Sequence, residues 1–294
     1  MENEQNSAKM NINWFPGHMA KTRKMISDNL KLVDVVIELT DARIPLASRN
    51  PEVNKMVGNK PKVIILNKSD MSDPQINEEW RKHYREQGQK CIFVDSIKGT
   101  GINQVKSALK EIMKPVFEKD IAKGRIFRPI RVMVIGIPNV GKSSFINKLS
   151  GRAFAQTGDR PGVTRSKQWV KISGDIELLD TPGILWPKFD DEEVALNLAF
   201  TGAIKDEVMD VSELALKLIE RFISIYPEQL KVRYKLESLE NKTPLEILEE
   251  CAIKRGCIVK GGEINYERIS NIILDEFRGT KIGLISLEKP ERRP

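Results

Sequence analysis

The sequence predicts an α/β domain, built on a mostly parallel sheet with helices on both faces, followed by a small all-α C-terminal domain. Apolar runs of strand length alternate with helical patterns from residue 33 to residue 179, which is the order expected of parallel strands joined by helices. From Asp190 onward the patterns are helical only. Polar and Gly-rich segments follow the apolar runs directly, so we expect them to meet at the carboxyl edge of the sheet, where such folds bind ligands.

The first elements are expected in the following order. Residues 1–12 are polar, and we expect no ordered element there. A basic amphipathic helix is predicted over Met19–Leu32, and it leads into a strand over Val33–Leu39. Lys62–Leu66 and Cys91–Val94 are short apolar runs that indicate two further buried strands.

A strand, a Gly-rich loop and a helix follow in the middle of the chain. The strand is predicted over Ile130–Ile135, and the helix runs through Ser144–Leu149 and ends near Gly151. Ile176–Leu179 is the last predicted strand. This strand–loop–helix unit is the context that a phosphate-binding loop requires.

The C-terminal part carries signals of helix starts and ends. Residues from Asp206 to Ile225 have apolar side chains at helical spacing, and the pattern stops before Pro227. Thr243-Pro244-Leu245-Glu246 is a capping box with proline at the first helical position, and Gly256 closes that helix.

The segment from Gly136 to Ser143 reads Gly-Ile-Pro-Asn-Val-Gly-Lys-Ser and fits the phosphate-loop pattern G-x-x-x-x-G-K-[ST] without a mismatch. Its glycines allow backbone N–H groups to close around phosphate oxygens, and the helix that follows favours an anion at its N-terminus. Lys142 is expected to reach the β- and γ-phosphates, and the Ser143 hydroxyl to bind Mg²⁺. The expected nucleotide contacts of this loop are Asn139, Val140, Gly141, Lys142, Ser143 and Ser144.

Two loops have the pattern of guanine recognition. Asn67-Lys68-Ser69-Asp70 follows the strand over residues 62–66, and the Asp70 carboxylate is suited to accept N1–H and the exocyclic amine of guanine. Adenine would leave that carboxylate without donors, so Asp70 should reject it. Asn67 is expected to bond the other edge of the base. The loop that begins at Asp95, with Ser96 and Ile97, is predicted to bring the Ser96 backbone amide near O6.

Asp180-Thr181-Pro182-Gly183 follows the strand over residues 176–179. Asp180 is expected to hold Mg²⁺ through water, and the Gly183 N–H to contact the γ-phosphate. Thr164 ends the segment Pro161-Gly162-Val163-Thr164, which has the spacing of the loop whose threonine binds the metal in GTPases (switch I). We expect Thr164 to be this metal ligand, and Thr157 is the alternative.

The order of these motifs carries a resemblance to a known family. The base-reading motifs come before the phosphate loop, which is a rotation of the usual GTPase order. With Asp41-Ala42-Arg43-Ile44-Pro45 and the N-terminal Asn13-Trp14-Phe15-Pro16-Gly17-His18-Met19, the chain resembles the YlqF type of circularly permuted P-loop GTPase, the bacterial ribosome biogenesis GTPase A family. The similarity covers nearly the whole chain. It implies a permuted GTPase domain over residues 1–189 and a helical RNA- or ribosome-binding domain over residues 190–294.

The resemblance also implies a cytoplasmic protein that binds GTP, GDP and Mg²⁺ and acts late in assembly of the large ribosomal subunit, with rRNA and ribosomal proteins as partners. We expect a monomer that does not bind membranes. The alternative is a GTP-binding regulatory module with little hydrolysis that acts on a tRNA, a membrane or a protein.

Catalysis departs from the best-known GTPases at Ile184, where many small GTPases carry a glutamine that orients the attacking water. Ile184 cannot do so, and the resemblance points to His18 as the group that orients the water. A turn or capping role is the alternative for His18. Asn139 occupies the position at which some GTPases bind K⁺, and a loop-shaping asparagine is the alternative there.

Composition agrees with this interpretation but does not select it. The net charge of +7 and pI of about 9.2 favour a polyanionic partner without naming one. Cys91, Cys251 and Cys257 have no metal-binding spacing and are expected to be reduced thiols. Two histidines are too few for a histidine metal site, and no apolar run approaches membrane-spanning length.

Overall fold

The computed structural model describes residues 24–125, 128–151, 169–179, 191–206 and 209–290. Six strands form one sheet in the order β3-β2-β1-β4-β6-β5. Their bounds are β1 Val35–Asp41, β2 Lys62–Asn67, β3 Cys91–Val94, β4 Ile130–Gly136, β5 Trp169–Ser173 and β6 Ile176–Leu179. Every pairing is parallel except that of β5 with β6, so the predicted mostly parallel sheet is confirmed. The sequence pattern did not predict β5, the antiparallel edge strand.

Helices cover both faces of the sheet, as predicted. The helix at residues 24–30, α2 (Pro51–Val57) and α3 (Pro74–Glu86) pack on one face. α4 (Ile102–Ala122) and α5 (Lys142–Ser150) pack on the other. Strand β1 is buried along its whole length because alternate residues point into both layers. Val35, Ile37 and Leu39 join the core under α4 and α5, whereas Val36 packs with the helix at residues 24–30.

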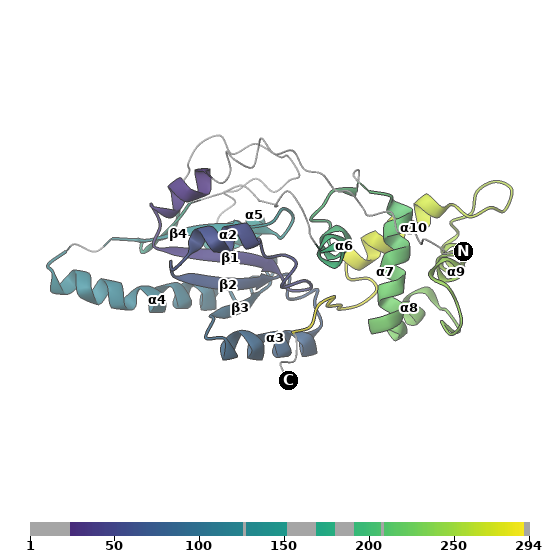
Figure 1. The fold of residues 1–294 in the computed structure, drawn as a ribbon, viewed down its shortest axis with the longest axis horizontal. Helices are drawn as coiled ribbons and strands as arrows, with labels where there is room; N and C mark the ends of the chain where they lie inside the picture. Colours follow the sequence, from purple (N-terminus) through teal and green to yellow (C-terminus); the bar gives the residue numbers. More distant parts are fainter. Residues whose placement is uncertain (1–23, 126–127, 152–168, 180–190, 207–208, 291–294) are drawn as a thin grey trace, which may run out of the picture.

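The C-terminal part is a group of helices beside the carboxyl edge of the sheet (Figure 1). Its described helices are α6 Glu192–Phe200, α7 Val211–Ile225, α8 Pro227–Tyr234, α9 Pro244–Arg255 and α10 Tyr266–Arg278. α7 and α10 pack together, with the rings of Phe222 and Phe277 edge to face at 5.7 Å. The predicted capping box at Thr243 and the terminating Gly256, with φ of 65°, are both present in α9.

The predicted start of the helix that ends at Ile225 was too early. α7 begins at Val211 because the Asp210 side chain accepts hydrogen bonds from Ser212 N and Glu213 N and so caps the helix. The three cysteines are unpaired, as expected. No helix in the described part of the chain is long and apolar enough to cross a membrane.

The end of the chain returns from α10 to the sheet, which the sequence did not predict (Figure 1). We call residues 282–288 the C-terminal strap. Leu287 N donates to Arg43 O at 2.8 Å, and Ile285 N donates to Met71 O at 3.2 Å. The strap side chains Ile282, Ile285 and Leu287 are buried, and each contributes roughly 1.5–3 kcal/mol of burial energy. The helical part is therefore held to the sheet by its far end. The predicted domain boundary, between residues 189 and 190, lies outside the described residues.

Glu288 anchors the end of this strap. Its carboxylate accepts Leu46 N at 2.6 Å and Ala47 N at 3.0 Å, while Asn197 Nδ2 of α6 lies 3.3 Å away. Burial raises the pKa of Glu288 to about 7, although these three donors favour its charged form. The nearby carboxylate of Glu193 contributes to this raised pKa.

This raised pKa predicts a pH dependence of stability. The folded protein holds the Glu288 proton more tightly than the unfolded chain, where the carboxyl titrates near 4.5. Stability should therefore fall as the pH rises from about 4.5 to about 7. Glu288→Gln keeps an acceptor but does not titrate. We expect urea unfolding to show the wild type losing stability relative to the variant between these pH values, and parallel pH profiles would contradict the assignment.

Candidate nucleotide-binding site

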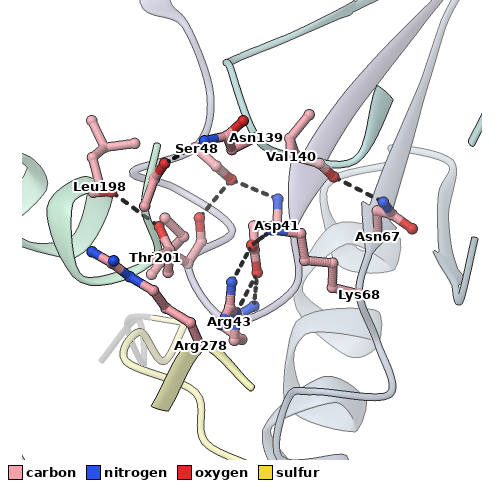
Figure 2. Close-up of polar contacts among 12 residues, drawn as sticks. Asp41, Arg43, Ser48, Asn67, Lys68, Asn139, Val140, Leu198, Thr201 and Arg278 are labelled. Atoms are coloured by element: carbon pink, nitrogen blue, oxygen red, sulfur yellow. Dashed lines mark hydrogen bonds and ion pairs between the residues drawn. The ribbon is translucent and has the colours of Figure 1, made fainter. Parts of the chain in front are cut away.

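The predicted site residues meet at the carboxyl edge of the sheet. Asp41 at the end of β1 pairs in register with Asn67 at the end of β2. Asp95 follows β3, and β4 ends at Gly136, where the phosphate loop begins. Four neighbouring strands thus deliver the three motif loops and Asp41 to one edge of the sheet. Figure 2 shows Asp41 and Asn67 beside Asn139 and Val140 of the phosphate loop.

The backbone of the phosphate loop has the left-handed turns that a phosphate cradle needs. Asn139 has φ of 56° and Gly141 has φ of 88°. A Cβ atom on Gly141 would lie 2.5 Å from Asn67 Nδ2, and one on Gly136 would lie 2.7 Å from Leu39 O. Both glycines are therefore required by close packing. The loop leads into α5, whose N-terminus has no side-chain cap and, like other helix N-termini, favours an anion.

The residues present fit a bound nucleotide phosphate and part of a Mg²⁺ site. Lys142 and Ser143 occupy the first turn of α5, where the ammonium and hydroxyl suit phosphate and metal. The other proposed metal and γ-phosphate contacts, Thr164, Asp180 and Gly183, lie outside the described residues, as does Ile184. Within the described residues no group of three or more His, Cys, Asp or Glu side chains could hold a metal by itself.

Asn67 joins the three motif loops. Its Nδ2 donates to Val140 O of the phosphate loop at 2.8 Å, and its Oδ1 accepts from Ser96 Oγ at 2.6 Å. The sequence suggested that Asn67 bonds the base, and that contact stays a prediction. What the structure shows is a connecting role, which fixes the phosphate loop relative to the base-reading loops.

The two predicted base-reading loops differ in the exposure of their residues: Asp70 is partly exposed, Ser96 is buried and Ile97 is exposed. Among the described residues none donates a hydrogen bond to the carboxylate of Asp70, which lies in the turn after Lys68. In the next loop, Asp95 Oδ1 accepts from Ile97 N at 2.8 Å and Lys98 N at 2.9 Å. This carboxylate shapes the turn, in which Ile97 is 71% exposed. The contact of either loop with a base therefore stays a prediction.

A buried ion network under the site was missed by the sequence analysis. Arg43 makes a bidentate pair with Asp41, with Nε–Oδ1 of 3.0 Å and Nη2–Oδ2 of 2.8 Å. Lys68 Nζ lies 3.0 Å from the same Asp41 Oδ2. Asp41 thus holds the lysine of the guanine motif. Its place beside Asn67 at the end of a predicted strand was the signal that could have revealed this role.

The charges of this network are set by burial and pairing. Burial alone would raise the pKa of Asp41, but Arg43 and Lys68 hold it well below its usual range. Burial lowers the pKa of Lys68, an effect that Asp41 opposes. Two cations therefore share one fully buried carboxylate, so a substitution of Arg43 should also change the ion pair of Lys68 with Asp41.

Of the two remaining predicted residues, Asn139 lies in the described part of the chain and His18 does not. Asn139 Nδ2 donates to Gly202 O, just after α6, at 2.7 Å. Its binding of K⁺ stays a prediction. His18, the proposed catalytic residue, and the neighbouring Trp14 and Phe15 lie outside the described residues.

Comparison with known proteins decides the family. "Ribosome biogenesis GTPase A" of Bacillus pumilus is 49% identical over 282 residues, which cover 96% of this chain and 100% of the relative. The protein of the same name from Thermotoga maritima is 30% identical over 95% of both chains. The chain belongs to the ribosome biogenesis GTPase A family. As a member of it, the protein binds GTP and GDP and hydrolyses GTP.

Other comparisons agree with this family. A family model described as "50S ribosome-binding GTPase" matches residues 131–249. A GDP-bound structure of TM YlqF aligns with a TM-score of 0.66 and 29% identity, covering 91% of this chain and 100% of that one. GNP-bound YlqF from T. maritima aligns with a TM-score of 0.63, covering 92% and 99%. The circularly permuted P-loop GTPase fold that the sequence predicted for this protein is therefore confirmed.

Proposed function

We propose that this GTPase acts in late maturation of the large ribosomal subunit, in the cytoplasm and as a monomer. In this proposal the protein binds rRNA and ribosomal proteins of the particle, and the bound nucleotide sets the affinity. Support comes from relatives named as ribosome biogenesis GTPases and from the matched 50S ribosome-binding GTPase family. The net charge of +7 suits an RNA partner.

The observation that carries the proposed chemistry is the connection of the three motif loops through Asn67. In this proposal, Asp70 accepts the donors of guanine and Ser96 and Ile97 line the base. Backbone groups of residues 139–144 and Lys142 hold the phosphates. Ser143, with Thr164 and Asp180, would hold Mg²⁺, which supplies charge neutralisation at the phosphates.

Hydrolysis then needs a water molecule in line with the γ-phosphate. Ile184 has no group to orient it, so we assign that task to His18, whose imidazole can accept a hydrogen bond or a proton from water. Gly183 would contact the γ-phosphate and so report the nucleotide state. Hydrolysis by the free protein should be slow, and the ribosomal particle should accelerate it by positioning His18, Thr164 and Gly183.

Sedimentation tests the choice of partner. Purified large subunits, small subunits and bulk tRNA are each mixed with the protein in the presence of GDP or a non-hydrolysable GTP analogue. We expect binding to large subunits that depends on the nucleotide and weakens steeply with salt, because phosphate contacts release counterions. Binding that ignores both the nucleotide and the particle would leave only non-specific affinity for polyanions, and the proposal would fall.

A further inference from the structure

The phosphate loop is held from two sides by two different parts of the chain (Figure 2). From within the sheet domain, Asn67 Nδ2 donates to Val140 O at 2.8 Å. From the C-terminal helices, Gly202 O accepts from Asn139 Nδ2 at 2.7 Å. Two adjacent residues of the phosphate loop are thus fixed by separate hydrogen bonds, one from the sheet domain and one from the C-terminal helices.

The position of the Gly202 carbonyl is set by Arg278 at the end of α10. Arg278 Nε donates to Phe200 O at 3.0 Å, and its Nη2 donates to Ala199 O at 2.9 Å. Its guanidinium also pairs with Asp206 at 2.7 Å through both terminal nitrogens. Gly202 N in turn donates to Ala199 O at 3.0 Å. One side chain therefore ties together the last carbonyls of α6 and the turn that presents Gly202 O.

The hydrogen bond to Gly202 is made by Asn139, a residue with a strained backbone conformation. Asn139 has φ of 56°, a conformation that non-glycine residues adopt only at a cost. Because the backbone N–H groups of the phosphate loop must point together to bind phosphate, anything that stabilises this turn in the free protein reduces the ordering cost of binding. The hydrogen bond to Gly202 fixes the Asn139 side chain and so favours this turn.

We propose that Arg278 is a positioning residue of the nucleotide site, acting through Gly202 and Asn139, so that the docked C-terminal helices strengthen nucleotide binding. This inference rests on the proposed phosphate-binding role of residues 139–144. Linkage makes the effect reciprocal: a nucleotide that tightens the loop also favours the docked helices. The C-terminal part, which is the proposed ribosome-facing part, thereby senses the nucleotide through described contacts that do not involve residues 180–190.

A double-mutant cycle on GDP affinity tests the proposal. Fluorescent GDP is titrated into wild type, Arg278→Ala, Asn139→Ala and the double variant. One net hydrogen bond corresponds to roughly a 2- to 10-fold change in affinity, so Arg278→Ala should weaken GDP by about that factor. In the Asn139→Ala background, the same change should have almost no effect, because the connection to the loop is already lost.

Arg268→Ala is the matched control, since it removes an exposed arginine from the same helix. It should leave GDP affinity unchanged. Asp206→Asn is a milder variant that weakens the hold on Arg278 without removing it, and it should give a smaller loss that Asn139→Ala also abolishes. Circular dichroism checks that each variant is folded.

The inference is overturned if Arg278→Ala and Asp206→Asn leave GDP affinity unchanged. It is equally overturned if they weaken it by the same factor in both backgrounds, because the arginine would then act on general stability. These titrations contain no ribosomal particle. If the proposed partner is wrong, only the sedimentation experiment shows it. If the role of Arg278 is wrong, only the double-mutant cycle on GDP affinity shows it.

Discussion

Replacing Asp70 by asparagine should change which base the site accepts. The carboxylate is the proposed acceptor for N1–H and the amine of guanine, and it lies partly exposed in the turn after Lys68. Asparagine presents one oxygen and one NH₂ group, which suits the extra carbonyl of xanthine. We expect Asp70→Asn to lose several kcal/mol of GTP binding and to gain affinity for xanthosine triphosphate, because a site built to pair a polar group rejects a mismatched one strongly.

Competition titration with GTP, xanthosine triphosphate and ATP measures this exchange. Glu79→Gln is the control, since it makes the same acid-to-amide change at an exposed position on the neighbouring α3. It should bind all three nucleotides like the wild type. If Asp70→Asn keeps wild-type GTP affinity, Asp70 does not read the base.

Replacing His18 by alanine should separate chemistry from binding. His18 is assigned to the attacking water, so its loss should leave nucleotide affinity within a few fold. The turnover stimulated by ribosomal particles should fall by on the order of 10² or more, the usual range for a general base or water-orienting group. Phosphate release at saturating GTP in the presence of ribosomal particles measures the turnover, and titration with GDP measures the nucleotide affinity.

Two variants calibrate that result. Lys142→Ala should weaken nucleotide binding itself, because its ammonium is proposed to pair with the phosphates. His83→Ala removes the chain's other histidine, which lies on α3 and contacts Gln87, and it should change neither quantity. Equal losses of affinity and turnover in His18→Ala would assign His18 a structural role.

The sequence predicted the features that depend on local pattern. Strand runs, the phosphate loop and the capping box at Thr243 each place their signal within a few consecutive residues, and the structure bears out these elements. The meeting of the motif loops was also predictable, because parallel strands bring their carboxyl ends to one edge. β5 was missed because a short edge strand exposed on one side has a weak pattern.

Long-range contacts between polar groups were not predictable in this way. The pairing of Lys68 with Asp41 joins the loop after β2 to the end of β1, and the contact of Asn139 with Gly202 joins the phosphate loop to the turn after α6. Glu288 reaches Leu46 across nearly the whole chain. Such contacts depend on how completed elements pack, and any exposed acid or amide has the same local pattern. The C-terminal strap was invisible for the same reason.

Coupling between GTP hydrolysis and the large ribosomal subunit is the central claim, and GTP turnover with and without purified large subunits tests it most directly. The free protein should hydrolyse GTP slowly because Ile184 cannot orient water. Large subunits should accelerate turnover strongly, up to the roughly 10³- to 10⁵-fold range seen for partner-stimulated GTPases, and small subunits should not. Equal turnover with large subunits, with small subunits and with neither would contradict the account.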